Sequence, residues 1–179
     1  MPATHIAFLR GINVGTAKRV PMAGLRAMFE GLGYTKVATL LNSGNVVFTG
    51  RRETPAQAEA RIEKAIVARF GFPSRTTVLT AEELAAVVAG NTLCEIATDP
   101  SRLMVAVLKT HADRARIDPL GERAWTPGQL ALGARCAYLW CPEGVLESEL
   151  AVAAGKALGD AVTMRNWSTI LKLHALAAR

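Results

Sequence analysis

The first half of the chain alternates short apolar runs with segments whose apolar residues recur at helical spacing. Residues 5–10 form an apolar run that ends at Gly11, a pattern typical of a buried strand. Thr80, with Glu83 three residues later, predicts a capped helix start. Strands are predicted at residues 5–10, 36–41, 45–49 and 75–79, and helices at residues 22–32, 56–70 and 81–89.

The second half of the chain repeats this order of elements. Strands are predicted at residues 103–108, 129–132, 135–140 and 161–164, and helices at residues 112–120, 146–158 and 166–178. A β-α-β-β-α-β order is typical of the ferredoxin-like fold. The sequence therefore predicts an α+β protein made of two ferredoxin-like units, each βαββαβ plus a trailing helix, with antiparallel sheets. The predicted domains are residues 1–95, which carry Gly-rich motifs, and the related residues 96–179, which end in an Arg-Asn-Trp helix.

Three polar stretches interrupt the apolar pattern: residues 8–15, residues 42–48 and residues 164–167. Each joins strand or helix material to a turn that offers hydrogen-bonding groups. We expect the first and third strands to be parallel neighbours, which places Arg10 and Asn45 at opposite ends of the sheet unless the intervening loop folds back. The hypothesis is that the three stretches nevertheless converge on one hollow.

These stretches supply the candidate binding site. Gly11 and Gly15 allow backbone N–H groups to approach an anion, and basic side chains beside them supply charge. The structural alternative is that Asn13 ties its own loop, that the second stretch is a hairpin turn, and that the third caps the last helix and adds a core tryptophan. The predicted ligand-binding residues are Arg10, Asn13, Lys18, Ser43, Asn45, Arg165 and Asn166.

Charge and composition narrow the classes of function. The net charge of +6 favours anionic partners, although a chain rich in arginine by composition alone would show the same excess. The three cysteines and three histidines are scattered, so neither a disulfide framework, a metal site nor a cofactor is predicted. The apolar runs are too short for a membrane span and no secretory signal is visible, which favours a cytoplasmic protein. The oligomeric state stays open.

Four functions fit these features. The first is a cytosolic binding protein for a small anionic or nucleotide-like ligand. The second is a nucleic-acid-binding module that stacks bases on Phe8 and Phe48 of the first and third strands. The third is an enzyme of unknown class with Ser43 as nucleophile, although no base stands at a fixed spacing from it. The fourth is a structural or interaction role.

The same motifs resemble those of the domain of unknown function 1697 family. The resemblance rests on residues 9–15, on Val20-Pro21-Met22, on residues 43–48 and on the ending at residues 165–173. It covers nearly the full length of the chain. It implies a bacterial-type cytosolic protein with an α+β, ferredoxin-related fold, and it implies no activity.

Overall fold

The computed structural model describes residues 2–179, and the chain divides into two compact units. Unit 1 comprises residues 1–84 and 173–179, and unit 2 comprises residues 85–172. Two helices, α3 (Ala81–Ala89) and α6 (Trp167–Ala177), contribute residues to both units.

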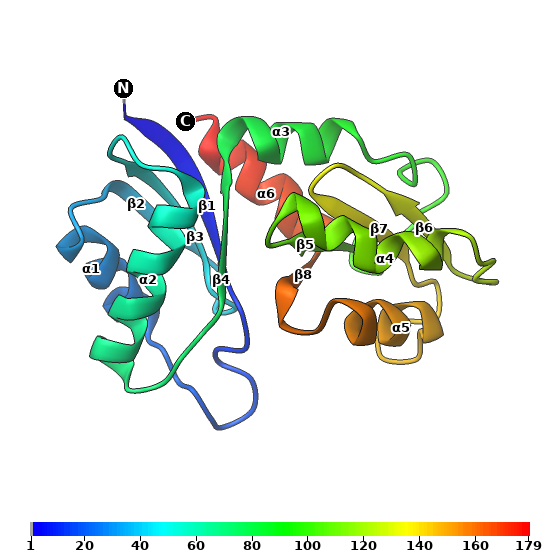
Figure 1. The fold of residues 1–179 in the computed structure, drawn as a ribbon, viewed down its shortest axis with the longest axis horizontal. Helices are drawn as coiled ribbons and strands as arrows, with labels where there is room; N and C mark the ends of the chain where they lie inside the picture. Colours follow the sequence, from blue (N-terminus) through cyan, green and yellow to red (C-terminus); the bar gives the residue numbers. More distant parts are fainter. Residues whose placement is uncertain (1) are drawn as a thin grey trace. The chain divides into compact units, whose positions relative to one another are not determined.

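Unit 1 contains a four-stranded antiparallel sheet in the order β2-β3-β1-β4. Figure 1 shows α1 and α2 together on one side of this sheet, with a long loop leaving the end of β1. Its elements are β1 (Ala3–Leu9), α1 (Met22–Gly31), β2 (Thr35–Leu40), β3 (Asn45–Gly50), α2 (Pro55–Phe70) and β4 (Thr76–Thr80).

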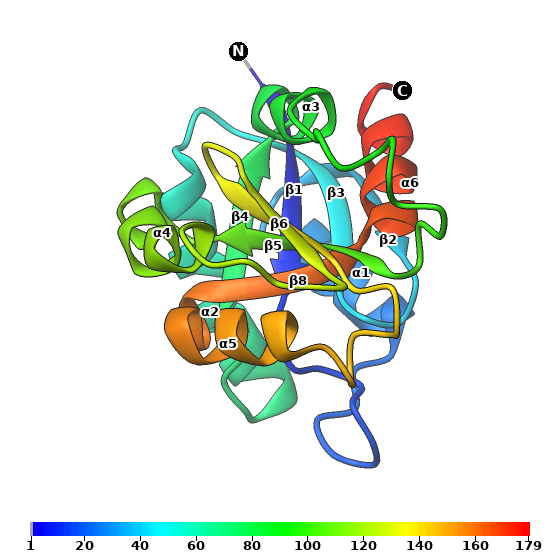
Figure 2. The same cartoon turned by 90° about the vertical axis from the view of Figure 1, so that its right-hand side faces the viewer.

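Unit 2 repeats this topology with the strand order β6-β7-β5-β8. The sheet is antiparallel throughout, and Figure 2 views it with α4 and α5 beside it. Its elements are β5 (Leu103–Leu108), a 3-10 turn (His111–Asp113), α4 (Arg114–Gly121), β6 (Gln129–Leu132), β7 (Cys136–Trp140), α5 (Glu149–Leu158), a 3-10 turn (Gly159–Ala161) and β8 (Val162–Asn166). The predicted α+β class with two ferredoxin-like units is confirmed.

The predicted direction of the third strand is wrong. β3 runs antiparallel to β1, and Phe8 pairs with Asn45. In this fold the strand that parallels β1 is β2, and β3 lies between the two as an antiparallel partner. The end of β1 and the start of β3 therefore lie at the same end of the sheet, so the two Gly-rich stretches of unit 1 are neighbours by topology.

Helix ends follow local sequence signals. At the start of α3 the Thr80 Oγ1 accepts from Glu83 N at 3.1 Å, and Glu83 Oε2 accepts from Thr80 N at 2.9 Å, the reciprocal cap that the sequence predicts. Thr54 and Gln57 form the same arrangement at the start of α2. These caps fix where the two helices begin, and the burial of Ala58, Ile62 and Ile66 decides which face of α2 remains open to solvent.

Both phenylalanines considered for base stacking are buried. Phe48 lies in the core of unit 1, where it packs edge-on to Phe29 and 4.5 Å from the ring of Tyr34. Phe8 has no exposed surface. Neither ring is available to a base on an open sheet face, because stacking requires a solvent-accessible aromatic surface.

Candidate functional site

Asn13 closes the loop that follows β1. Its Oδ1 accepts from Val20 N at 2.8 Å, and its Nδ2 donates to Val20 O at 2.9 Å. The same Nδ2 lies 2.7 Å from Asn42 O, which ties this loop to the β2–β3 turn. Asparagine suits this position because Asn13 adopts a φ of 54°, in the left-handed region that Asn tolerates better than most residues. The side-chain amide of Asn13 is thus committed to backbone groups.

Gly44 allows the two loops to meet closely. Its carbonyl accepts from Leu9 N at 2.8 Å. A Cβ at this position would lie 2.8 Å from Leu9 Cβ and 2.8 Å from Ile12 Cδ1, and its φ is +83°. Steric space and backbone conformation therefore both require glycine here.

Asn45 and Ser43 stabilise the turn before β3. Asn45 is fully buried, and its Nδ2 donates to Leu40 O and to Ser43 Oγ, each at 2.9 Å. These bonds satisfy an amide that would otherwise be costly to bury. The contacts of both residues are those of the hairpin-turn interpretation, and their role in ligand binding stays a prediction.

Arg10 and Lys18 line a hollow of about 900 Å³ in unit 1, which we call the cationic groove. Arg10 is held in place by its backbone, because its N–H donates to Arg75 O at 2.9 Å and its carbonyl accepts from Ser74 Oγ at 2.8 Å. The groove is lined by Arg10, Gly11, Lys18, Ala60, Glu63, Lys64, Val67, Pro73, Ser74 and Arg75.

Lys64 and Arg75 are groove residues that the sequence analysis did not select. Lys64 lies on α2 with Ala60 and Val67. The three residues share one helix face because Lys64 is four residues after Ala60 and three before Val67. Arg75 lies just before β4, and β4 pairs with β1. The available signal was the solvent-facing stripe of α2, together with the β1–β4 pairing of the predicted fold.

Glutamates of α2 hold one wall of the groove against the sheet. Glu59 Oε1 accepts from Val78 N at 2.8 Å, and Glu63 Oε1 accepts from Thr76 N at 2.9 Å. β4 is an edge strand, so its outward N–H groups would otherwise be open to another strand. The two carboxylates, one helical turn apart, occupy the place of that strand and fix α2 along β4.

The positive charge of the protein belongs to unit 1. Unit 1 holds twelve Lys and Arg against six Asp and Glu, a net +6, whereas unit 2 holds nine of each and is neutral. Within the groove, Arg75 Nη1 lies 3.8 Å from Glu63 Oε2, a solvent-exposed pair of little energetic weight. Lys18 Nζ lies 6.0 Å from the centre of the Phe72 ring. The excess of cations favours anions in this groove.

Arg165 and Asn166 belong to unit 2 and lie at the start of α6. Asn166 Oδ1 accepts from Thr169 N at 2.9 Å and from its Oγ1 at 2.8 Å, which is the geometry of a helix N-cap. Arg165 donates from Nη1 to Met164 O at 2.9 Å, and burial lowers the pKa of its guanidinium to about 10. Convergence of these residues with the groove stays a prediction.

A cluster of metal-binding side chains and a long apolar helix are both absent from residues 2–179. In this described part of the chain, no group of three His, Cys, Asp or Glu side chains is arranged to hold a metal ion. Across the same residues, every helix is too short or too polar to traverse a bilayer.

Comparisons with known proteins agree with this fold. The model of a family described as protein of unknown function (DUF1697) matches residues 3–138. The structure of a conserved bacterial protein from Streptococcus pneumoniae superposes with a TM-score of 0.76 at 22% identity, covering 99% of both chains. At this identity the likeness concerns the fold alone. A search of curated proteins gave no match.

Proposed function

The chain belongs to DUF1697, a family of proteins of unknown function, and we propose that unit 1 binds a small anionic, nucleotide-like ligand in the cationic groove. Arg10 and Lys18 contact the anion from the loop after β1, Arg75 contacts it from the neighbouring residue before β4, and Lys64 contacts it from α2. Guanidinium groups suit phosphate because they donate two parallel hydrogen bonds to its oxygens.

One observation carries this proposal: four basic side chains from three separate segments line a single hollow in the unit that holds all of the net charge. The glutamates nearest to the groove support it too. Glu59 and Glu63 direct carboxylate oxygens to backbone N–H groups of β4, which reduces their opposition to an incoming anion.

A bacterial, cytoplasmic location is part of the same proposal. All three cysteines are free thiols, and Cys136 and Cys141 are buried. Free thiols are typical of proteins from reducing compartments.

Ligand binding is testable by calorimetry and by melting shifts with inorganic phosphate, pyrophosphate and nucleoside mono-, di- and triphosphates. Loss of the Arg10 guanidinium in Arg10→Ala removes a charge-assisted hydrogen bond, so we expect affinity to fall by about 10- to 100-fold. Lys64→Ala weakens binding less, because an ammonium contributes a single point charge.

Arg52→Ala is the matched control. Arg52 is exposed and belongs to the same unit, but it follows β3 at the end of the sheet away from Arg10. The control should bind like the unmodified protein. If no anion of this panel shifts the melting temperature, or if Arg52→Ala weakens binding as much as Arg10→Ala, the proposal is wrong. Binding of single-stranded oligonucleotides alone would favour the nucleic-acid alternative.

A further inference from the structure

The groove has an apolar wall as well as a cationic one, and from this we infer the class of ligand. Resting on the proposed function, the inference is that unit 1 selects a phosphate ester with an apolar or aromatic body of nucleoside size over an inorganic anion. The phosphate lies against the basic residues of the loop and β4, and the body lies along α2.

The apolar wall comes from the open face of α2. Val67 is 49% exposed there, and Ala60 lies two turns earlier on the same face. The opposite face of α2 buries Ile62 and Ile66 in the core of unit 1. A single exposed valine is ordinary on a protein surface, but this one lines a hollow that four basic side chains also line.

The size of the groove exceeds what an inorganic anion requires. Its volume of about 900 Å³ lies at the upper end of the range for sites that take organic ligands of drug size. Such sites combine apolar walls with a few polar groups that fix orientation. A bare phosphate would use the basic groups and leave Ala60, Val67 and Pro73 in contact with water.

The two kinds of wall fix an orientation for the ligand. Arg10 and Arg75 are hydrogen-bonded through their backbones and both line the groove, so in the inferred complex both face the anionic group of the ligand. Val67 lies one turn beyond Lys64 on α2, which places the apolar surface beside a further cation. An amphipathic phosphate ester satisfies both surfaces at once.

The inference is tested by comparing adenosine diphosphate with pyrophosphate on the full chain by calorimetry. We expect the nucleotide to bind at least about ten-fold more tightly, because its base and ribose cover apolar surface that pyrophosphate leaves in water. Val67→Thr keeps the shape of the side chain and replaces a methyl group with a hydroxyl. It should weaken the nucleotide by about three- to five-fold and leave pyrophosphate unchanged.

Val152→Thr is the matched control, because Val152 is a helical valine of 50% exposure in unit 2. It should change neither affinity. Equal affinity for the nucleotide and pyrophosphate, with no effect of Val67→Thr, overturns the inference while loss of binding in Arg10→Ala still supports anion binding. If neither anion binds, the inference and the proposed function both fail.

Discussion

The two units share a topology but differ at the end of their first strand. In unit 1, Leu9 N donates to Gly44 O and Arg10 N donates to Arg75 O. In unit 2, the corresponding bonds run from Leu108 N to Arg135 O and from Lys109 N to Ala161 O. The last residues of the first strand are therefore bonded in the same way in both units, and the units differ in the side chains at these positions and in the segment that follows.

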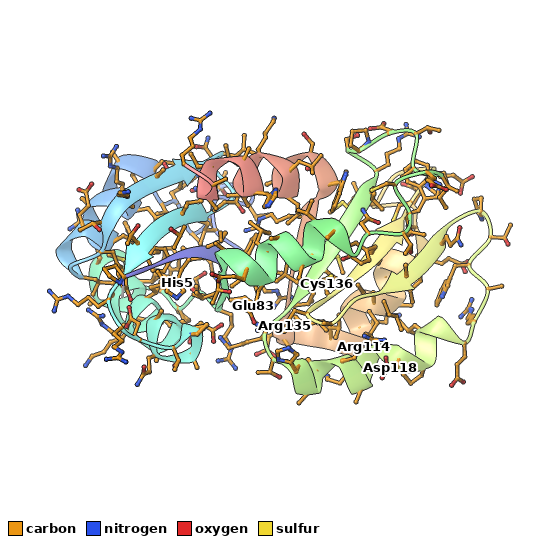
Figure 3. All side chains as sticks on the ribbon, turned by 90° about the horizontal axis from the view of Figure 1, so that it is seen from above. His5, Glu83, Arg114, Asp118, Arg135 and Cys136 are labelled. Carbon is orange, nitrogen blue, oxygen red and sulfur yellow. The ribbon has the colours of Figure 1, made fainter. Side chains whose placement is uncertain are left out.

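Gly44 of unit 1 corresponds to Arg135 of unit 2. Gly44 leaves space that Leu9 and Ile12 fill. Arg135 is only 9% exposed, and its guanidinium donates to Leu108 O at 3.2 Å and to Lys109 O at 3.0 Å. Figure 3 marks Arg135 and Cys136 at the start of β7. In unit 2 the buried Arg135 thus binds backbone carbonyls of its own unit, whereas in unit 1 Arg10 is exposed and lines the groove.

The segment after the first strand completes the contrast. Unit 1 inserts a long loop between Leu9 and Met22, held by Asn13. Unit 2 turns at once into a 3-10 segment, because Thr110 and Asp113 cap its start reciprocally. The same scaffold therefore carries an open cationic groove beside the loop after β1 in unit 1, and a 3-10 turn with an internally bonded arginine at the corresponding end of unit 2.

A side chain at Gly44 should lower the free energy of unfolding more than the other substitutions below. Gly44→Val places a branched side chain 2.8 Å from two neighbours at a φ of +83°, so we expect a loss of about 3–5 kcal/mol in the free energy of unfolding. Chemical denaturation measures it. Gly15→Val has a φ of +60° but nothing within 4 Å, so it should cost only about 1–2 kcal/mol. Equal losses in the two variants would show that the close approach at Gly44 is unimportant.

Removing the hydrogen bonds of Arg135 at the corresponding end of unit 2 should lower the free energy of unfolding less. Arg135→Met keeps an apolar stem but removes charged donors from the carbonyls of Leu108 and Lys109. We expect the free energy of unfolding to fall by about 2 kcal/mol. The exposed Lys172→Met should stay within about 0.5 kcal/mol of the unmodified protein. An Arg135→Met protein as stable as the unmodified one would contradict an internal role for this guanidinium.

The smallest effect concerns Cys136, which occupies in unit 2 the register position of Asn45 in unit 1. Burial raises the pKa of its thiol from 9.0 to about 11. The folded state thus holds the thiol proton more tightly than the unfolded state does. The contribution of the neutral thiol to the free energy of unfolding is therefore complete below pH 9 and is lost as the pH rises towards 11. By pH 10 the loss is about 1.4 kcal/mol.

Cys136→Ala should remove that part of the alkaline slope. Denaturation of both proteins at pH 7 and pH 10 checks it, and the difference between their slopes reports the thiol together with its contact to Tyr138. Burial also raises the pKa of Tyr34 and Tyr138, so both proteins should retain some loss of stability at high pH. Identical pH dependence in the two proteins would contradict the effect of Cys136.

Periodicity and local caps determined the elements of this fold. The apolar patterns gave the strands and helices in their observed order, because one buried face imposes its repeat on the sequence. Thr80 and Asn166 cap helices through bonds to residues three positions away, which a local pattern can report. Arg10 and Lys18 could be predicted as site residues because they lie in a Gly-rich loop directly after an apolar strand, which is a local feature of the sequence.

The set of residues that line the groove became known only from the tertiary structure, because they come from segments far apart in the chain. Lys64 looks like any lysine on a solvent-facing helix stripe, and Arg75 like any arginine before a strand, until β4 pairs with β1 and brings them to Arg10. The error in the direction of β3 had a different origin, since the predicted hairpin between the second and third strands already implies that β3 runs antiparallel to β1. The helices and strands could be predicted from the sequence because hydrophobic periodicity and helix caps involve residues close together in the chain. The groove depended on contacts between distant segments, which no local pattern encodes.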